Sequence, residues 1–190
     1  HESGCSEKIA LVPNSNQMDV WLITHKLSNN NYVVYDITAS GISATSQTYS
    51  VGSIFQWNDN SGYLKANKSG TQLAVAVLWG NICEVVNFNP ATGIVSGNAT
   101  NYGTIITSDL NGDWYGLEFS PNGQYLYAAR CQFGAPASLY QINLIDNSYT
   151  LLSTESGPVD YYYGALELGP DGKIYMAKNT SPYLGVINDP

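Results

Sequence analysis

The sequence has little positive charge. Lysine and arginine together number 7, against 15 aspartates and glutamates, and the formal net charge is -8. Arg130 is the only arginine. A surface that binds nucleic acid or an anionic membrane needs clustered lysine and arginine, so the composition argues against both partners. An acidic, lysine-poor, tyrosine- and asparagine-rich chain is typical of extracellular proteins, and we expect an extracellular or cell-surface location.

Cysteine is also scarce, and long apolar runs are missing. Cys5, Cys83 and Cys131 are odd in number and show no C-x-x-C spacing, which argues against a zinc site or a complete disulfide framework. Cys83 and Cys131 stand in or beside strand-like runs and are expected to behave as small apolar residues, whereas Cys5 could pair outside this chain. No run of about 18 apolar residues occurs, so no membrane insertion is expected.

The composition favours strands. The helix formers Glu, Lys and Arg are few, whereas the chain contains 15 Tyr and 18 Gly besides many Val, Ile, Thr, Asn and Ser. Valine, isoleucine, threonine and tyrosine favour strands, and glycine, asparagine, aspartate and serine favour turns. These residues predict an all-β protein.

Three segments repeat one another at a spacing of roughly 50 residues. They begin at Gly62, Gly116 and Gly164, and each runs through a hairpin turn into a second apolar strand. A fixed period of this length, built from short strands, is typical of a β-propeller with one blade per repeat.

We therefore predict a single propeller segment over residues 1–190, with about four blades of four-stranded antiparallel sheet. The blades are expected at about 7–52, 60–105, 114–155 and 162–190, with innermost strands at 8–12, 63–66, 116–119 and 165–168. The fourth blade lacks an outermost strand in the sequence pattern. We expect the segment to be an excerpt of a larger ring, with the remaining blades of the same polypeptide as partners; a native four-bladed ring is the alternative.

Carboxylates and aromatic rings crowd the loops before the innermost strands. In a propeller these loops meet around one axis at the mouth of the central channel. Rings can stack on sugar C–H faces while acids accept hydrogen bonds from hydroxyls, which suits carbohydrate. The alternative is that the acids cap turns and the rings fill space between blades. The predicted ligand-binding residues are Trp57, Asp59, Asp113, Trp114, Asp160 and Tyr162. Trp114, expected in a loop rather than a strand, is the leading single candidate.

One segment partly resembles a calcium-binding loop. Asp109, Asn111 and Asp113 place oxygen ligands at positions 1, 3 and 5, but the glycine is misplaced and position 12 is Ser120 rather than glutamate. A calcium site is one interpretation and an Asx-rich turn is the other. No other cofactor is predicted.

No catalytic constellation is present in the sequence. G-x-S-x-G, H-E-x-x-H and glycine-rich phosphate loops do not occur, and His25 is expected to be structural, hydrogen-bonded between blades. Glu118 and Glu167 occupy equivalent positions on innermost strands, and Lys65 takes the same place in the second blade. These three residues are expected to line the channel as a charged ring; solvated channel walls are the alternative reading.

The sequence also resembles a known family. The stretches D-V-W-L-I-T-H at 19–25, S-P-N-G at 120–123 and L-G-V-I-N at 184–188 stand in an order similar to the N-terminal propeller of large secreted Bacteroidetes surface proteins. Those proteins often carry PKD-type modules and a C-terminal domain associated with type IX secretion or gliding motility. The resemblance covers essentially all 190 residues and implies surface attachment, but it carries over no catalytic residue.

Together these observations predict a non-enzymatic extracellular binding or adhesion module of a bacterial cell-surface protein, with a glycan or protein ligand. Two alternatives remain open. One is a lactonase- or glycosidase-like propeller hydrolase with a channel metal. The other is a structural spacer.

Overall fold

The structure is a computed structural model that describes residues 4–107, 113–132, 135–155, 163–179 and 181–190. Within these residues it is almost entirely β-sheet, and its single helix is the short α1 (Tyr102–Ile106). The described part of the chain contains no helix that is long and apolar enough to cross a membrane.

The strands form four consecutive antiparallel sheets, which we call blades 1 to 4. In blade 1, β3 pairs with both β4 and β5, so that the two share the outer position. The described strands of blade 4 number three. Blade 1 contains β1 (Cys5–Pro13), β2 (Val20–Lys26), β3 (Asn29–Thr38), β4 (Gly41–Ile42) and β5 (Gln47–Phe55). Blade 2 contains β6 (Leu64–Ala66), β7 (Gln72–Val77), β8 (Ile82–Asn89) and β9 (Ile94–Asn101). Blade 3 contains β10 (Asp113–Phe119), β11 (Tyr125–Gln132), β12 (Ala135–Asn143) and β13 (Tyr149–Glu155). Blade 4 contains β14 (Tyr163–Leu168), β15 (Ile174–Lys178) and β16 (Gly185–Ile187).

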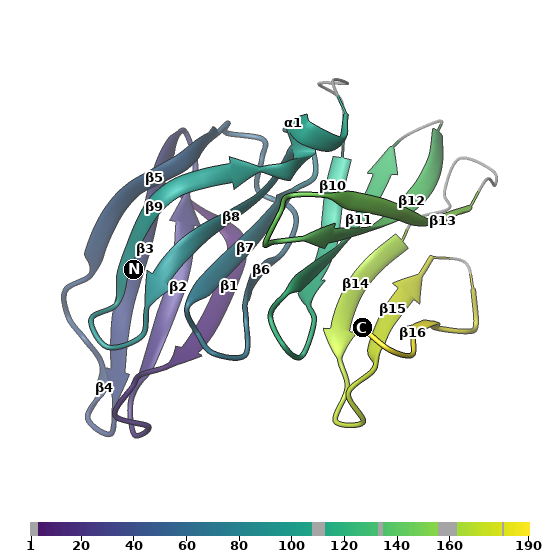
Figure 1. Ribbon diagram of the computed structural model, residues 1–190. Helices are drawn as coiled ribbons and strands as arrows, with labels where there is room; N and C mark the ends of the chain where they lie inside the picture. Colours follow the sequence, from purple (N-terminus) through teal and green to yellow (C-terminus); the bar gives the residue numbers. More distant parts are fainter. Residues whose placement is uncertain (1–3, 108–112, 133–134, 156–162, 180) are drawn as a thin grey trace.

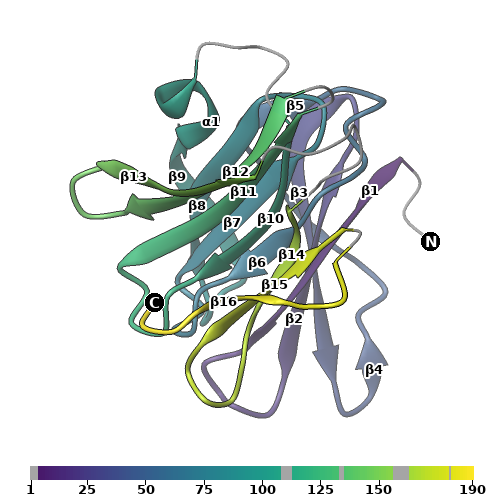
Figure 2. The ribbon, with the colours of Figure 1, turned by 90° about the vertical axis from the view of Figure 1, so that its right-hand side faces the viewer.

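In Figure 1 blades 1 and 2 overlap on the left, and blades 3 and 4 lie on the right, with blade 4 in yellow-green and yellow below blade 3. The first strand of each blade is the innermost one: β1 contacts β6, β6 contacts β10, and β10 contacts β14. Figure 2, turned by 90°, shows the β14–β16 sheet nearest the viewer, at the end of the series. This arrangement confirms the predicted β-propeller fold of antiparallel blades.

The hairpin turns between the two inner strands of blades 2, 3 and 4 depend on glycine. Gly70, Gly123 and Gly172 have φ of 68°, 72° and 79°, a conformation that residues with a Cβ atom rarely adopt. In blade 1 the same place is taken by Gln17, with φ of 60°. These turn glycines therefore repeat because of a backbone requirement, and they are distinct from Gly62, Gly116 and Gly164, whose spacing predicted the repeat.

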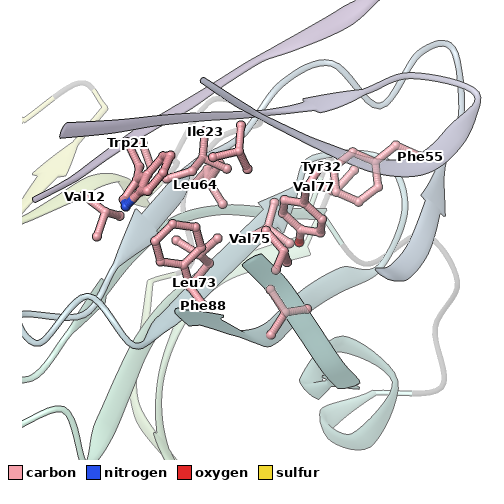
Figure 3. Close-up of a cluster of buried hydrophobic side chains, with 14 of the residues drawn as sticks. Val12, Trp21, Ile23, Tyr32, Phe55, Leu64, Leu73, Val75, Val77 and Phe88 are labelled. Carbon is pink, nitrogen blue, oxygen red and sulfur yellow. The ribbon is translucent and has the colours of Figure 1, made fainter. Parts of the chain in front are cut away.

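The apolar core lies between the blades. Figure 3 shows the joint between blades 1 and 2, where Trp21 and Ile23 of β2 face Leu64 of β6 and Leu73 of β7. A second cluster joins blades 2 and 3, and a third joins blades 3 and 4. Because both faces of a middle blade pack against neighbours, its strands are apolar on both sides, as in β7, where every residue after Gln72 is buried.

Candidate functional site

Three innermost strands bring charged side chains together in the central channel. Lys65 of β6, Glu118 of β10 and Glu167 of β14 each stand five residues before the positive-φ glycine of their own hairpin turn. The Lys65 ammonium lies 3.1 Å from Glu118 Oε2 and also donates to Glu167 Oε2. The predicted charged ring is therefore confirmed as a three-blade ion network, which we call the channel triad.

Burial and charge act in opposite directions within the channel triad. Burial favours the neutral form of Lys65, but the hydrogen bonds and charges of Glu167 and Glu118 outweigh it and raise the pKa of Lys65. Burial raises the pKa of Glu118, and the neighbouring Lys65 only partly offsets this rise. Glu118 also accepts a hydrogen bond from the backbone N–H of Leu168 at 3.3 Å, which ties blade 3 to blade 4.

A cavity of about 540 Å³ opens beside the channel triad. Its volume falls in the range of small-molecule binding sites. One part of its wall is polar and another apolar, a combination that suits a ligand with both hydroxyl groups and C–H faces. The lining residues are Ile9, Ala10, Leu11, Tyr63, Leu64, Lys65, Ala66, Lys68, Glu118, Phe119, Ser120, Glu167 and Leu168.

A smaller cavity of about 300 Å³ shares Ile9 and Tyr63 with the larger one. Its other lining residues include Glu7 and Tyr115. The rings of Tyr63 and Tyr115 stand edge to face, with centroids 5.4 Å apart. Together the two cavities place two half-buried tyrosine rings and a carboxylate on one wall of the channel.

Lys8, the neighbour of Glu7, also lines the smaller cavity, but its ammonium group is engaged by the protein. Its buried ammonium donates to the carbonyl oxygens of Asp59, Asn60 and Ser61 at 3.0, 3.1 and 2.9 Å. Burial lowers the pKa of Lys8 to about 8, although the charges of Glu7 and Asp59 oppose the shift. Three carbonyls satisfy all three N–H donors, so Lys8 fastens the loop between β5 and β6 to blade 1.

Two predicted site residues, Trp57 and Asp59, lie in that loop. Trp57 is 79% exposed, whereas Asp59 is only 2% exposed. The Asp59 carboxylate accepts a hydrogen bond from the backbone N–H of Gln56 at 2.7 Å, the turn-capping role that was the alternative interpretation. Trp57 is accessible to a ligand, and whether it binds one stays a prediction.

The expected loop position of Trp114 is wrong. Trp114 lies in strand β10, is fully buried, and donates from Nε1 to Asn81 Oδ1 at 3.0 Å. Its ring packs in the cluster between blades 2 and 3, near Tyr140. Asp113, the first residue of the same strand, is also buried. The Trp114 ring is therefore not exposed for stacking on a ligand, and the half-buried ring of its neighbour Tyr115 is the one that lines a cavity.

Four other predicted residues lie outside the described residues. These are Asp160 and Tyr162 of the proposed mouth and Asp109 and Asn111 of the calcium interpretation. The ligand and calcium roles assigned to them stay predictions. Among the residues that the structure does describe, no group of three or more His, Cys, Asp or Glu side chains is placed to hold a metal ion.

Sequence reasoning found the channel triad but missed Glu7, Tyr63 and Tyr115 as cavity-lining residues. The register of β10 against β11 shifts between Trp114 and Leu117, which is an irregularity of the β-bulge kind. Such a shift changes which residues share a face of the strand. Trp114 and Leu117 therefore both lie in the joint between blades 2 and 3, whereas Tyr115 lines the smaller cavity. The nearby Gly116 was the available signal, because glycine inside a strand often marks a bulge or a close approach.

Comparison with known proteins identifies the fold of the chain. No protein-family model matches the sequence, and no curated protein matches it. Among solved structures, the chain is similar to the β-propeller domain of Myceliophteria thermophila Cps50 (Swd1), with a TM-score of 0.62 and 14% identity over 98% of this chain and 54% of that one. It is also similar to a putative 6-phosphogluconolactonase from Bacteroides uniformis, with a TM-score of 0.60 and 10% identity over 94% of this chain and 49% of that one. A third is a protein of unknown function from Bacteroides caccae, with a TM-score of 0.53 and 16% identity over 93% of this chain and 57% of that one.

The 190 residues thus span about half the length of these solved chains. Sequence identities of 10% to 16% show that the fold is shared and nothing about function, because propellers host many unrelated functions. The chain is a β-propeller segment.

Proposed function

We propose that this propeller segment is a non-enzymatic binding module of an extracellular bacterial surface protein, and that its channel binds carbohydrate. The observation that carries the proposal is the wall made by Tyr63 and Tyr115 next to the channel triad. Tyrosine rings present flat faces to sugar C–H groups, and carboxylates and ammonium groups pair with hydroxyls. The low positive charge of the chain and its resemblance to Bacteroidetes surface proteins support the location, including the link to type IX secretion and PKD modules.

A glycan array, followed by calorimetric titration of the strongest hit, tests the binding role. We expect a saturable hit whose affinity falls about ten-fold or more in Tyr115→Ala, since removal of a binding aromatic side chain costs about 1–3 kcal/mol. Tyr183→Ala is the matched control, because Tyr183 is 78% exposed and lines neither cavity. The melting temperature of each variant shows whether its fold is intact.

Trp57→Ala extends the same experiment to the predicted mouth. A loss of affinity in this variant would place the ligand across the loop between β5 and β6 as well as the channel. An array without hits, or equal affinities for Tyr115→Ala and Tyr183→Ala, would refute the proposed channel site and favour the spacer interpretation.

One observation favours a hydrolase as the second candidate. Burial raises the pKa of Glu118, as a general acid requires, and Glu167 lies across Lys65 from it. A broad esterase, lactonase and glycosidase screen tests this candidate, with Glu118→Gln as the inactivating variant. Turnover that survives Glu118→Gln would exclude Glu118 as the acid.

The surface location is tested separately from binding. Protease treatment of intact source cells should degrade the protein while a cytoplasmic marker stays intact. Full protection of the protein in intact cells, with degradation only after lysis, would contradict an extracellular location.

A further inference from the structure

The smaller cavity combines a carboxylate with two tyrosine rings, and the three side chains come from three blades. Glu7 belongs to β1, Tyr63 directly precedes β6, and Tyr115 lies in β10. All three line the cavity of about 300 Å³, and the planes of the two rings stand at 84° to each other. The cavity therefore joins a negative charge to aromatic surface.

The Glu7 carboxylate is held in place but not neutralised. The backbone N–H of Gly62 donates to Glu7 Oε1 at 3.1 Å, which positions the side chain. Glu7 is exposed to solvent, and it forms no ion pair within the described residues. Burial raises the pKa of Tyr115, and the charges of Tyr63 and Glu7 add to the rise. Glu7 therefore acts on the Tyr115 phenol and offers the cavity a negative charge.

Lys8 follows Glu7 in the sequence, but its ammonium group has other partners. Its acceptors are the carbonyls of residues 59–61, and its Nζ lies 5.3 Å from the ring centroid of Phe55. None of these residues lines either cavity. Because three carbonyls satisfy its three N–H donors, Lys8 leaves the Glu7 carboxylate open to another cation.

The chain already holds two of its own ammonium groups with this chemistry. Lys65 of the channel triad has two carboxylate partners, and its Nζ lies 5.9 Å from the ring centroid of Tyr63. Lys178 pairs with Glu155, and its Nζ lies 5.9 Å from the ring centroid of Tyr163. A cation at this distance is attracted by the electrons of the ring. The smaller cavity repeats the combination of carboxylate and tyrosine ring, without a lysine paired to its carboxylate.

We infer that the smaller cavity binds an ammonium group of the ligand, and that the carbohydrate in the channel is an amino sugar with free amines. The inference rests on the carbohydrate role proposed above. The two cavities share Ile9 and Tyr63, so an oligosaccharide with one ammonium group at Glu7 extends its other rings into the larger cavity. There the carboxylates of the channel triad accept hydrogen bonds from hydroxyls. The net charge of -8 also attracts a cationic ligand.

A matched pair of ligands isolates the contribution of the ammonium group. The tetramer of β-1,4-linked glucosamine and its N-acetylated form share one sugar backbone, but only the first carries ammonium groups. Calorimetric titration at pH 6, where the sugar amines are largely protonated and carboxylic acids are ionised, measures both affinities. We expect the glucosamine tetramer to bind about ten-fold or more tightly than the N-acetylated tetramer.

Two variants locate the ammonium group. Glu7→Gln removes the charge but keeps an acceptor for the Gly62 N–H, so this variant should bind the two tetramers with similar affinity. Asp146→Asn is the control, because it removes the same charge from an exposed turn between β12 and β13 that lines neither cavity. It should keep the preference, and melting temperatures show that both variants are folded. A preference in Glu7→Gln as large as in the parent chain would overturn the inference.

Failure of this inference and failure of the proposed function give different results. Similar affinities of the parent chain for the two tetramers would overturn the inference and leave carbohydrate binding in place. A glycan-array hit on an amine-free sugar, with neither tetramer bound, would do the same. An array without hits, with neither tetramer bound, would refute both. Spermidine carries ammonium groups without sugar rings, so spermidine that binds as tightly as the glucosamine tetramer would identify a polyamine ligand and overturn the inference.

Discussion

Polar side chains occupy two regions of this molecule, the joints between blades and the wall of the channel, and they behave differently in each. In the joints, Lys8 donates to backbone carbonyls and Trp114 donates to the Asn81 side chain, so that these donors are paired within the protein. In the channel, Lys65 holds two carboxylates from two other blades next to a cavity. Burial lowers the pKa of Lys8, and the charges of Glu7 and Asp59 only partly oppose it, whereas the hydrogen bonds and charges of Glu167 and Glu118 outweigh burial and raise the pKa of Lys65.

We therefore expect polar residues in the joints to contribute to stability and polar residues in the channel to contribute to ligand binding. A buried donor with backbone acceptors fixes the position of a loop and leaves no group for a ligand. A charged group that faces a cavity can exchange a protein partner for a ligand. We therefore expect substitutions in the joints to reduce the free energy of unfolding far more than substitutions in the channel.

Trp114→Ala should give the largest loss in the joints. Truncation of a fully buried tryptophan leaves a cavity, and here it also removes the donor to Asn81, so the free energy of unfolding should fall by about 3–5 kcal/mol. Trp57→Ala, at an exposed position, should change it by no more than about 0.5 kcal/mol. Urea denaturation followed by circular dichroism measures both, and similar values for the two would contradict the assignment of Trp114 to the joint.

Lys8→Met should give the next largest loss, about 3–4 kcal/mol in the free energy of unfolding. Methionine keeps the approximate side-chain volume of lysine, but the carbonyls of residues 59–61 lose their shared hydrogen-bond donor. Lys68→Met is the control, since Lys68 is exposed. We expect hydrogen exchange to show a loosened loop between β5 and β6 only in Lys8→Met. Unchanged protection there would mean that Lys8 does not fasten the loop.

The predicted hydrogen bond of His25 between blades is wrong, because its Nδ1 pairs with the carbonyl of Lys26 in the same strand. His25 should nevertheless make the fold sensitive to acid. Its ring is buried and stacked on Phe55 with centroids 3.6 Å apart, and burial lowers its pKa from 6.5 to about 4. The unfolded state then binds a proton between about pH 6.5 and pH 4 that the folded state does not. The stability from neutral His25 is therefore complete above pH 6.5 and decreases as the pH falls, by about 3 kcal/mol in total.

The variant His25→Phe isolates this effect from the titration of the carboxylates. Urea denaturation at a series of pH values should give a shallower decrease from pH 6.5 to pH 4 in His25→Phe than in the parent chain. Parallel curves for the two proteins would show that His25 is not buried in the neutral form.

Lys65→Met should have a smaller effect on stability than Lys8→Met, because Glu118, whose pKa burial already raises, can take up a proton once its cation is lost. We expect the pKa of Glu118 to rise further in this variant, as followed by carbon-13 NMR of its carboxyl group. The double variant Lys65→Met with Glu118→Gln should recover most of the lost stability. A loss as large as that of Lys8→Met would place the channel triad among the groups that hold the blades together.

The sequence was sufficient for the fold and for the channel triad, since both follow from a repeat of roughly 50 residues. Residues that stand at a fixed distance from Gly70, Gly123 and Gly172 occupy equivalent places, so Lys65, Glu118 and Glu167 could be grouped before the structure was known. The position of Trp114 could not be predicted in this way, because a register shift in β10 changes the face on which it lies. The role of Lys8 was hidden for another reason: its partners are backbone carbonyls more than 50 residues later, which leave no mark on the sequence.

The claim that joints hold the fold while the channel is available for ligands is tested most directly by urea denaturation of Lys8→Met and Lys65→Met side by side at pH 7. Both variants replace an innermost-strand lysine with the same side chain. We predict that Lys8→Met loses at least three times as much free energy of unfolding as Lys65→Met. Equal losses, or a larger loss in Lys65→Met, would contradict the account.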